Sequence, residues 1–333
     1  MHEGAAIGSG PICSVIVVNW HSVGDLRKCL SSLHTQGEGS GLEIIIVDNA
    51  SYDGVSQYCR ELGSRVRFIQ SHRNLGFAAA NNLGASVATG RLLLFLNPDT
   101  EARPHAISRL LSVMESDLRI GVVGARLLNT DGTIQTSAVL PRPTVLGALL
   151  DARVIERRLP GLVPAGARVS RNEDAASRTV QAVSGACMLV RRSVFEAIRG
   201  FSEDYFMYAE DIDLCCKVRK IGGRVVHAPV AEVVHHGGGA TKSNGRNAFP
   251  VVLQRQSDWL CVRKFHGALY AFAYRAAVAA SACIRLCLIA LSSVALWPVN
   301  SLLPRNLIFK WRSVLSWALG GQIWCRDTTA MRK

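Results

Sequence analysis

Hydrophobic residues in the first hundred positions fall into short unbroken runs separated by mixed stretches. The unbroken runs predict four strands, at residues 13–19, 42–48, 66–70 and 91–96. The stretches between them favour helices, near residues 25–34, 53–62 and 77–88. Strands that are nearly continuously apolar and alternate with helices are typical of a parallel sheet covered on both faces. The pattern therefore predicts an α/β fold.

Polar residues stand where three of these strands end. Asn19 ends the first strand, Asp48 the second, and the turn Asn97-Pro98-Asp99 follows the fourth. Each of them also suits an ordinary turn or helix cap. In parallel α/β sheets, ligands bind beyond the carboxyl ends of the strands. Three polar ends at one edge therefore favour a binding site over three unrelated turns.

The second half of the chain is less regular. Residues 141–180 contain four prolines and no clear periodicity, which predicts a long loop or insertion. Beyond it the pattern predicts a strand at 183–190, a helix at 193–198, an acid-rich segment at 208–214, a strand at 224–227 and a second short strand ending at His235-His236.

The last ninety residues are apolar and basic. Arg285 interrupts the apolar stretch 276–299 and leaves 14 apolar residues, 286–299. As a helix these reach roughly 21 Å, short of a hydrocarbon core of roughly 30 Å, so a simple transmembrane span is not expected. Flanking basic residues and nearby tryptophans favour helices lying in an anionic headgroup layer. The tryptophans are Trp297, Trp311, Trp317 and Trp324. The alternative is a helical pair packed on the body.

Composition and charge support a division of the chain into a globular body and a basic, apolar C-terminal end. With 49% hydrophobic and 19% charged residues, the chain can bury a full core, which excludes disorder as its main state. The net charge is +13, and residues 255–333 carry +9 of it, so the rest is nearly neutral. We therefore expect no nucleic-acid partner and an anionic membrane surface instead. Ten scattered cysteines without a CxxC pair, and no secretory pattern after a loose leader at 1–11, indicate reduced thiols on the cytoplasmic side.

Seven short motifs follow one another in a specific order. They are Val18-Asn-Trp20, Val47-Asp-Asn-Ala-Ser51, Arg73-Asn-Leu-Gly-Phe-Ala-Ala-Ala-Asn-Asn82, Leu96-Asn-Pro-Asp99, Gly185-Ala-Cys-Met188, Phe206-Met-Tyr-Ala-Glu-Asp-Ile-Asp-Leu214 and Val234-His-His-Gly-Gly238. Together they cover residues 13 to about 241, and the chain resembles the family 2 glycosyltransferases of the GT-A fold. Among these it is most similar to rhamnosyltransferase-like members that build bacterial surface polysaccharides.

The resemblance implies a Rossmann-like GT-A domain at 12–241 and a basic, apolar helical region at 242–333. It implies that Asp48 accepts a hydrogen bond from a nucleobase imide and that small residues after 184 leave room for the sugar. The donor site expected from the strand ends and the resemblance consists of Asn19, Asp48, Asn74, Gly76, Asn81, Asn97, Gly185, Ala186 and Cys187. For Asn81 a helix-capping role is an equal alternative.

The resemblance also implies a divalent cation, Mg²⁺ or Mn²⁺, held by Asp99 and a later histidine. His235 matches that position better than His236, and imidazole suits Mn²⁺ better than Mg²⁺. Many GT-A enzymes have Asp-x-Asp where this chain has Asn97-Pro98-Asp99, so Asn97 contributes a carbonyl oxygen but no charge. The expected cation neutralises the charge on the departing diphosphate.

Three acids compete for the role of general base. If a helix begins near residue 209, Asp213 pairs with Lys217 on the surface, with Glu210 beside it. Asp211 shares its helical stripe with apolar residues, where desolvation would raise its pKa. The resemblance selects Asp211 as well. The alternative is that these acids only favour the first turn of a helix.

The expected reaction is a single displacement with inversion, from a nucleoside-diphosphate sugar to a hydroxyl of a glycan or polyprenyl-linked acceptor at the cytoplasmic face of the plasma membrane. Rhamnose from dTDP-rhamnose is favoured over a UDP-sugar. Two segments depart from the family pattern, Gln181-Ala182 and Gly200-Phe-Ser-Glu203. A sugar-nucleotide-forming nucleotidyltransferase and an inactive membrane-bound scaffold are alternatives. The former wants a basic, glycine-rich loop after the first strand, which residues 19–24 do not provide.

Overall fold

The structure is a computed structural model, and it describes residues 11–34, 41–150, 176–237, 248–295 and 305–321. Four of the expectations above lie outside these residues. They concern residues 1–10 of the leader, residues 151–175 of the insertion, Trp297 and Trp324.

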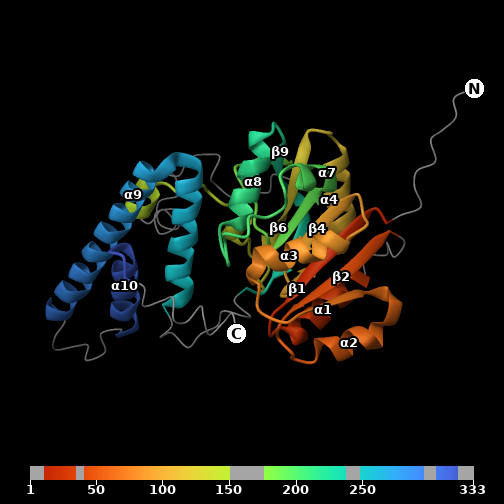
Figure 1. Cartoon of the computed structure of the whole chain (residues 1–333), viewed down its shortest axis with the longest axis horizontal. Helices are drawn as coiled ribbons and strands as arrows, with labels where there is room; N and C mark the ends of the chain where they lie inside the picture. Colours follow the sequence, from red (N-terminus) through yellow and green to blue (C-terminus); the bar gives the residue numbers. More distant parts are fainter. Residues whose placement is uncertain (1–10, 35–40, 151–175, 238–247, 296–304, 322–333) are drawn as a thin grey trace, which may run out of the picture.

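The first half of the chain forms the parallel sheet that its apolar pattern predicts (Figure 1). Its strands are β1 (Cys13–Asn19), β2 (Leu42–Asn49), β3 (Arg67–Ser71) and β4 (Leu92–Leu96). β1 lies between β2 and β4, β3 lies outside β2, and all of these pairs are parallel. The connections are α1 (Val23–His34), α2 (Val55–Leu62), the 3₁₀ turn η1 (Gly63–Arg65) and α3 (Gly76–Val87). Every residue of β1 is buried, as expected for a central strand.

The second half extends the sheet with strands of both directions. Its elements are β5 (Thr100–Ala102), α4 (Ala106–Glu115), β6 (Ile120–Leu128), η2 (Thr136–Ala138), α5 (Val145–Leu150), β7 (Arg178–Thr179), β8 (Cys187–Arg191), α7 (Arg192–Ala197), α8 (Glu210–Lys220) and β9 (Arg224–His235). The strand order is β3-β2-β1-β4-β8-β6-β9-β5, with β7 paired to β9. β8 is antiparallel to β4 and β6, whereas β6 and β9 are parallel.

One prediction in this half is wrong. The two strands expected at 224–227 and before His235-His236 are a single strand, β9, with an irregularity where pairing moves from Ala228 to Glu232. Pro229 lies at this irregularity and has no N–H to donate, so the chain bulges there and the strand continues.

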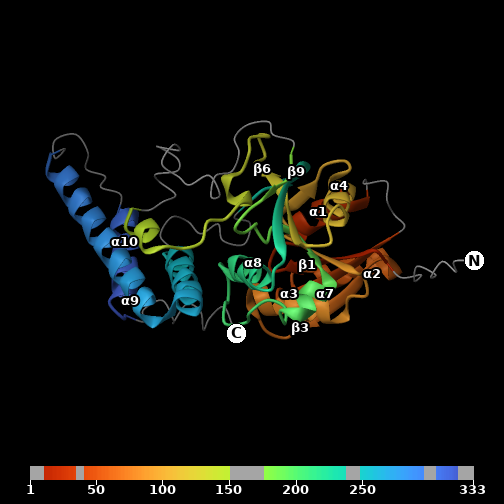
Figure 2. The same cartoon turned by 90° about the horizontal axis from the view of Figure 1, so that it is seen from above.

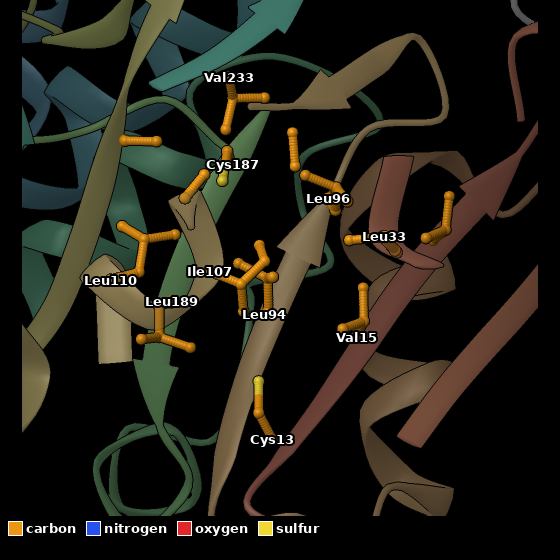
Figure 3. Packing of buried hydrophobic residues seen from close by; sticks show 14 of the residues in the cluster. Cys13, Val15, Leu33, Leu94, Leu96, Ile107, Leu110, Cys187, Leu189 and Val233 are labelled. Carbon is orange, nitrogen blue, oxygen red and sulfur yellow. The ribbon is translucent and has the colours of Figure 1, made fainter. Parts of the chain in front are cut away.

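Helices cover both faces of the sheet, as predicted. Alternate residues of β1 point to opposite faces, so Val15 belongs to one core cluster and Ile16 to the other. The first cluster packs against α1 and α4, and Figure 3 shows its side chains around β4 and β8. The second packs against α3, α7 and α8. Because the two cores hold β1, β2 and β4 from both faces, they also fix the position of the sheet edge at which these strands end.

A helical C-terminal region lies beside the sheet (Figures 1 and 2). α9 (Phe249–Ala295) bends at Gly267, where φ is 83° and ψ is 178°, into a first limb, residues 249–266, and a second limb, residues 268–295. The second limb packs with α10 (Arg305–Ala318) and α5 in a third hydrophobic cluster. By length and composition, the stretch Phe249–Leu291 of α9 could cross a membrane, because it contains an 18-residue window with a mean hydropathy of 1.6.

Two expectations for this region need correction. The apolar stretch is not a 14-residue helix, because α9 continues through Arg285 without a break. Arg285 is accommodated by placing its guanidinium 4.5 Å from the centre of the Trp311 ring. Trp311 and Trp317 are 8% and 2% exposed, so they pack in the third cluster and do not face a headgroup layer.

Candidate active site

A chain of hydrogen bonds places Asp99 and Asp211 at the same edge of the sheet. The backbone N–H of Asn97, at the end of β4, donates to the carbonyl of Ala186 over 2.9 Å. The next residue towards the N-terminus, Gly185, donates its N–H to Oδ2 of Asp211 over 3.1 Å. Asp99 follows Asn97 by two residues. Residues more than a hundred positions apart therefore meet where β4 ends and β8 begins.

Asp99 lies beside His235. Strand β5 pairs with β9 so that Thr100 is opposite His235, and Nε2 of His235 is 3.4 Å from Oδ1 of Asp99. Burial acts to raise the pKa of Asp99, but His235 outweighs it and the pKa is held below its ordinary value. Nδ1 of His235 is 2.7 Å from Oε1 of Gln135. The Gln135 amide nitrogen donates elsewhere, to Asn129 and to the His235 carbonyl, which orients the amide.

This orientation fits a metal ligand. An amide oxygen only accepts, so Nδ1 of His235 carries a proton. Nε2 faces Asp99: it donates to the carboxylate when the imidazole is protonated, and it presents a lone pair there when the imidazole is neutral. Two acceptors that face each other at 3.4 Å are stabilised by a cation between them. Asp99 and His235 are the residues that could hold such a cation, and the diphosphate would supply further oxygens. Among the described residues, no group of three or more His, Cys, Asp or Glu side chains could hold a metal by itself.

His236 lies in a different setting. Its Nε2 is 2.7 Å from Oε1 of Glu101, and its backbone N–H donates to the carbonyl of Asp99 over 2.9 Å. The carbonyl oxygen of Asn97 accepts the hydroxyl of Thr100 over 2.7 Å, which closes the turn that carries Asp99. Of the two histidines, His235 is the one whose side chain reaches Asp99.

Asp211 is a partly buried carboxylate with a fixed orientation. Its Oδ2 accepts from the Gly185 N–H, and its Oδ1 accepts from the N–H of Ile212 over 2.8 Å. Desolvation by burial has the largest effect and raises the pKa of Asp211 from 3.8 to about 6, although both hydrogen bonds oppose this change. At neutral pH the group is therefore ionised and still basic enough to accept a proton.

Glu210 differs from its neighbour. It is 5% exposed, and its Oε2 is buried with no hydrogen-bond partner. Burial and the adjacent Asp211 raise the pKa of Glu210 well above its ordinary value. Two successive residues with positive φ, Tyr208 at 72° and Ala209 at 64°, turn the chain into α8 just before this pair. Burial thus raises the pKa of both neighbouring acids.

Asp213 and Lys217 lie near each other as expected, but the prediction that this pair is on the surface is wrong. Asp213 is fully buried, and Lys217 lies 3.7 Å away. A closer cation, Lys264 of α9, lies at 2.8 Å. The helix packs between the sheet and the C-terminal region, so the face that looked solvent-exposed in isolation is covered.

Asn19 and Asp48, expected at the nucleotide, are both completely buried. The amide nitrogen of Asn19 donates to Oδ1 of Asp48 over 3.1 Å and to Oδ1 of Asp53 over 3.1 Å. Oδ2 of Asp48 accepts from Nε2 of Gln70 over 2.7 Å, and the N–H of Ser51 donates to the same carboxylate. These residues hold the loops after β1 and β2 together.

The segment that begins α3 is also held by internal contacts. Oδ1 of Asn74 accepts from Asn49 over 2.8 Å and from the N–H of Gly76 over 2.9 Å. A Cβ on Gly76, where φ is 81°, would lie 2.3 Å from the carbonyl oxygen of Phe206. Glycine is therefore required here by a protein contact, and the expected approach of a ligand to Gly76 stays a prediction. Asn81 is 1% exposed and donates to the Phe77 carbonyl within its own helix. It lies inside α3 and does not cap it, and its expected place at the nucleotide stays a prediction.

The three small residues expected around the sugar, Gly185, Ala186 and Cys187, lie in two different environments. Gly185 lies at the site through its contact with Asp211. Ala186 and Cys187 are 3% and 1% exposed, and their side chains pack in the core, where Figure 3 shows Cys187 among the buried residues of the first cluster. These two side chains therefore belong to the first core cluster, and the expectation that they leave room for the sugar stays a prediction.

Sequence reasoning did not find Gln135 and Gln70, which orient His235 and Asp48. Gln135 lies in no periodic segment or recognisable motif, so no local signal distinguishes it. Gln70 ends the strand predicted at 66–70, so the argument from polar strand ends could have found it. Asp53 could have been found, because it belongs to the motif region after Asp48 and both of its oxygens accept hydrogen bonds, from Asn19 and from the N–H of Val23.

The chain belongs to glycosyl transferase family 2. Residues 14–199, more than half of its length, match that family, and residues 169–319 match the glycosyl transferase family group 2. The chain is thus a glycosyltransferase with the GT-A fold, and the nucleotidyltransferase alternative is set aside.

Several characterised and named relatives share about a quarter of their residues with it. An N-acetylglucosaminyl-diphospho-decaprenol L-rhamnosyltransferase of Mycobacterium tuberculosis is 28% identical over 267 residues, which are 74% of this chain and 86% of that protein. A low-salt glycan biosynthesis hexosyltransferase of Haloferax volcanii is 28% identical, over 67% of this chain and 66% of the relative. Rhamnosyltransferase WbbL of Escherichia coli is 23% identical, over 67% and 82%.

Solved structures support the fold. A mannosyltransferase from Pyrobaculum calidifontis in complex with GDP-Man and Mn²⁺ superposes with a TM-score of 0.57 at 18% identity, covering 93% of this chain and 86% of that one. GalNAc-T7 with UDP, GalNAc and Mn²⁺ superposes with a TM-score of 0.52 at 15% identity, covering 67% and 42%.

Proposed function

We propose that this glycosyltransferase transfers a sugar from a nucleoside-diphosphate donor to an acceptor hydroxyl with inversion, and that Asp211 is the general base. The observation that carries the proposal is the contact chain between Asn97, Ala186, Gly185 and Asp211, which brings the base and Asp99 to one sheet edge. The retained ionisable carboxylate at 211 favours an active enzyme over an inactive scaffold.

The chain's own groups support a single displacement. The N–H groups of Gly185 and Ile212 orient the Asp211 carboxylate. Asp211 accepts the proton of the acceptor hydroxyl as its oxygen bonds to the anomeric carbon. The bond from that carbon to the diphosphate breaks on the opposite side, so the configuration inverts. A raised pKa makes Asp211 a stronger base than an exposed aspartate while leaving it ionised.

We assign Asp99 and His235 to a divalent cation, Mg²⁺ or Mn²⁺. The mixed carboxylate and imidazole donors favour Mn²⁺. A cation bound there would neutralise the charge that develops on the leaving diphosphate. The likeness to two structures that contain Mn²⁺ is consistent with this assignment.

The buried residues after β1 and β2 have a supporting role in this proposal. Asn19 and Asp48 fix the backbone of these loops, together with Asn74 at the start of α3, and so shape the nucleotide end of the site. Direct contact of Asp48 with a nucleobase requires Gln70 to release one oxygen. Asn97 lies at the diphosphate end, beside Asp99. The domain limits at 12–241 and 242–333 stay predictions.

We propose that the donor is dTDP-rhamnose or a UDP-sugar, and that the acceptor is a glycan or polyprenyl-linked glycan at the cytoplasmic face of the membrane. The name of the Mycobacterium tuberculosis relative, which describes rhamnosyl transfer to a diphospho-decaprenol, supports the preference for rhamnose and a lipid-linked acceptor.

The second limb of α9 supports contact with an anionic bilayer. Within residues 268–291, every exposed residue is Ala, Leu, Phe, Ile or Cys. The two arginines of that stretch face inwards: Arg275 donates to the carbonyls of Trp317 and Ala318, and Arg285 covers Trp311. A helix of a water-soluble surface has the opposite arrangement. α10 contains three basic residues and no acid, which favours anionic lipid.

The test of the function is turnover by the purified protein. dTDP-rhamnose and UDP-sugars are supplied with a polyprenyl-diphosphate N-acetylglucosamine acceptor, with Mn²⁺, Mg²⁺ or EDTA, and the product's anomeric configuration is read by NMR. We expect metal-dependent transfer with inversion. Asp211→Asn should lose about 100- to 10,000-fold in kcat and still bind donor. Asp204→Asn, a matched change at an exposed carboxylate, should keep wild-type activity. Retention of configuration, or full turnover by Asp211→Asn, would refute the proposal.

A further inference from the structure

A buried carboxylate lies between the base and the C-terminal region. Asp213 follows Asp211 by two residues on α8 and is fully buried. Its oxygens accept hydrogen bonds from the hydroxyl of Ser202 over 2.6 Å and from the hydroxyl of Tyr205 over 3.4 Å. Its backbone N–H donates to the carbonyl of Ala209 over 2.8 Å, which forms the first turn of α8. The side chain and backbone of Asp213 thus fix the turn that contains the base.

One of the two cations at Asp213 comes from a distant part of the chain. Nζ of Lys264, on the first limb of α9, is 2.8 Å from Oδ1 and also donates to Ser202 over 2.7 Å. Lys217, on α8 itself, is farther away, at 3.7 Å from Oδ2. Burial lowers the pKa of Lys217 more than the carboxylate raises it, so this lysine is the weaker partner. A buried carboxylate is stable only when it is paired. Lys264 is therefore the main counter-charge.

The same limb of α9 also supports the turn that leads into α8. The hydroxyl of Ser257 donates to the carbonyl of Met207 over 2.7 Å. Phe249 and Leu253 pack against Phe206 in a small cluster of buried residues. Residues 208 and 209 next to this contact have positive φ, a conformation that its surroundings must hold in place.

We propose that Lys264 is a positioning residue for transfer: by neutralising Asp213 it fixes the first turn of α8 and so aims Asp211 at the acceptor. This inference rests on the proposed role of Asp211. If Lys264 has this role, the chemical step requires the C-terminal region to be docked on the GT-A domain. The reason is that Lys264, the main counter-charge of Asp213, belongs to α9. Binding of the donor nucleotide, whose expected residues lie at β1 and β2, does not depend on it.

The first experiment replaces Lys264 in the full-length protein by Met, which keeps the aliphatic stem and removes the charge. We expect kcat to fall about 10- to 100-fold, because a misplacement of about 1 Å has an effect of this size, while KM for the donor changes less than about twofold. Lys264→Arg should restore most of the activity. Lys220→Met, the same change at an exposed position of α8, should leave kcat at the wild-type level. Wild-type kcat in Lys264→Met would overturn the inference.

A double-variant cycle separates positioning from folding. In an Asp213→Asn background there is no buried charge to neutralise, so Lys264→Met should change kcat less than about twofold relative to Asp213→Asn alone. The same loss in both backgrounds would refute the link between the two residues. This comparison remains available if the single Lys264→Met variant does not fold.

The Asp211→Asn variant tests the proposed function separately from the positioning role of Lys264. If Asp211→Asn is inactive and Lys264→Met is fully active, the proposed function stands and the positioning role fails. If Asp211→Asn turns over normally, the proposed function itself fails.

Discussion

The stability of the protein should depend on pH through Asp211, in a way that its removal makes visible. The perturbation is Asp211→Asn. In the folded protein, burial raises the pKa of Asp211 from 3.8 to about 6. At about 1.4 kcal/mol per pH unit, ionising Asp211 in the folded state costs about 3 kcal/mol more than in the unfolded chain. The folded state binds more protons between these two values, so wild-type stability falls as pH rises through this window.

The substitution has a cost of its own. The two oxygens of Asp211 accept from Gly185 and Ile212, and Asn offers only one acceptor. Losing one such hydrogen bond costs about 1 kcal/mol. At pH 7.5 we therefore expect Asp211→Asn to be about 2 kcal/mol more stable than the wild type, and at pH 4.5 the two should differ by less than about 0.5 kcal/mol.

The assay is urea unfolding at pH 4.5, 6.0 and 7.5, with Asp204→Asn as the matched control at an exposed carboxylate. The control should run parallel to the wild type at all three values. If Asp211→Asn shows the same pH dependence as the wild type, or is less stable at pH 7.5, Asp211 is not the desolvated carboxylate described above. A variant that is inactive yet more stable is the expected pattern for a residue kept strained for catalysis.

The remaining predictions concern rate, metal, packing and membrane contact. The kcat of the wild type should fall about tenfold per pH unit below about pH 6, because only ionised Asp211 accepts a proton; an acid limb centred below pH 5 would contradict this. Asp99→Ala and His235→Ala should each abolish the rise in melting temperature that Mn²⁺ with a nucleoside diphosphate gives the wild type; an unchanged rise would exclude them as ligands. Gly76→Ala should destabilise the fold by about 3 kcal/mol in urea unfolding, because its Cβ would lie 2.3 Å from a carbonyl oxygen. Leu288→Asp, on the exposed side of the second limb, should at least halve the fraction that cosediments with anionic vesicles at unchanged melting temperature; full cosedimentation would argue against this surface.

The sequence alone was sufficient for the elements with a strong local pattern. The continuous apolar runs at 13–19 and 42–48 could form only buried strands, and the order of motifs identified the family. The helical stripe of apolar residues did not predict which carboxylate is buried: Asp213 and Glu210 are buried, and Asp211 is only partly buried. The choice of Asp211 therefore depends on the family resemblance and stays a prediction.

Only the tertiary structure decided what each polar side chain does. Asn19, Asp48 and Asn74 look like ligand-binding residues from their positions after strands, yet their hydrogen bonds are to one another and to neighbouring loops. Asp213 looked exposed and is buried, because α9 covers it from fifty residues farther along the chain. Local periodicity describes one element at a time, whereas burial and pairing depend on which other elements pack against it. That information is distributed over the whole chain, and it becomes visible only when the chain is folded.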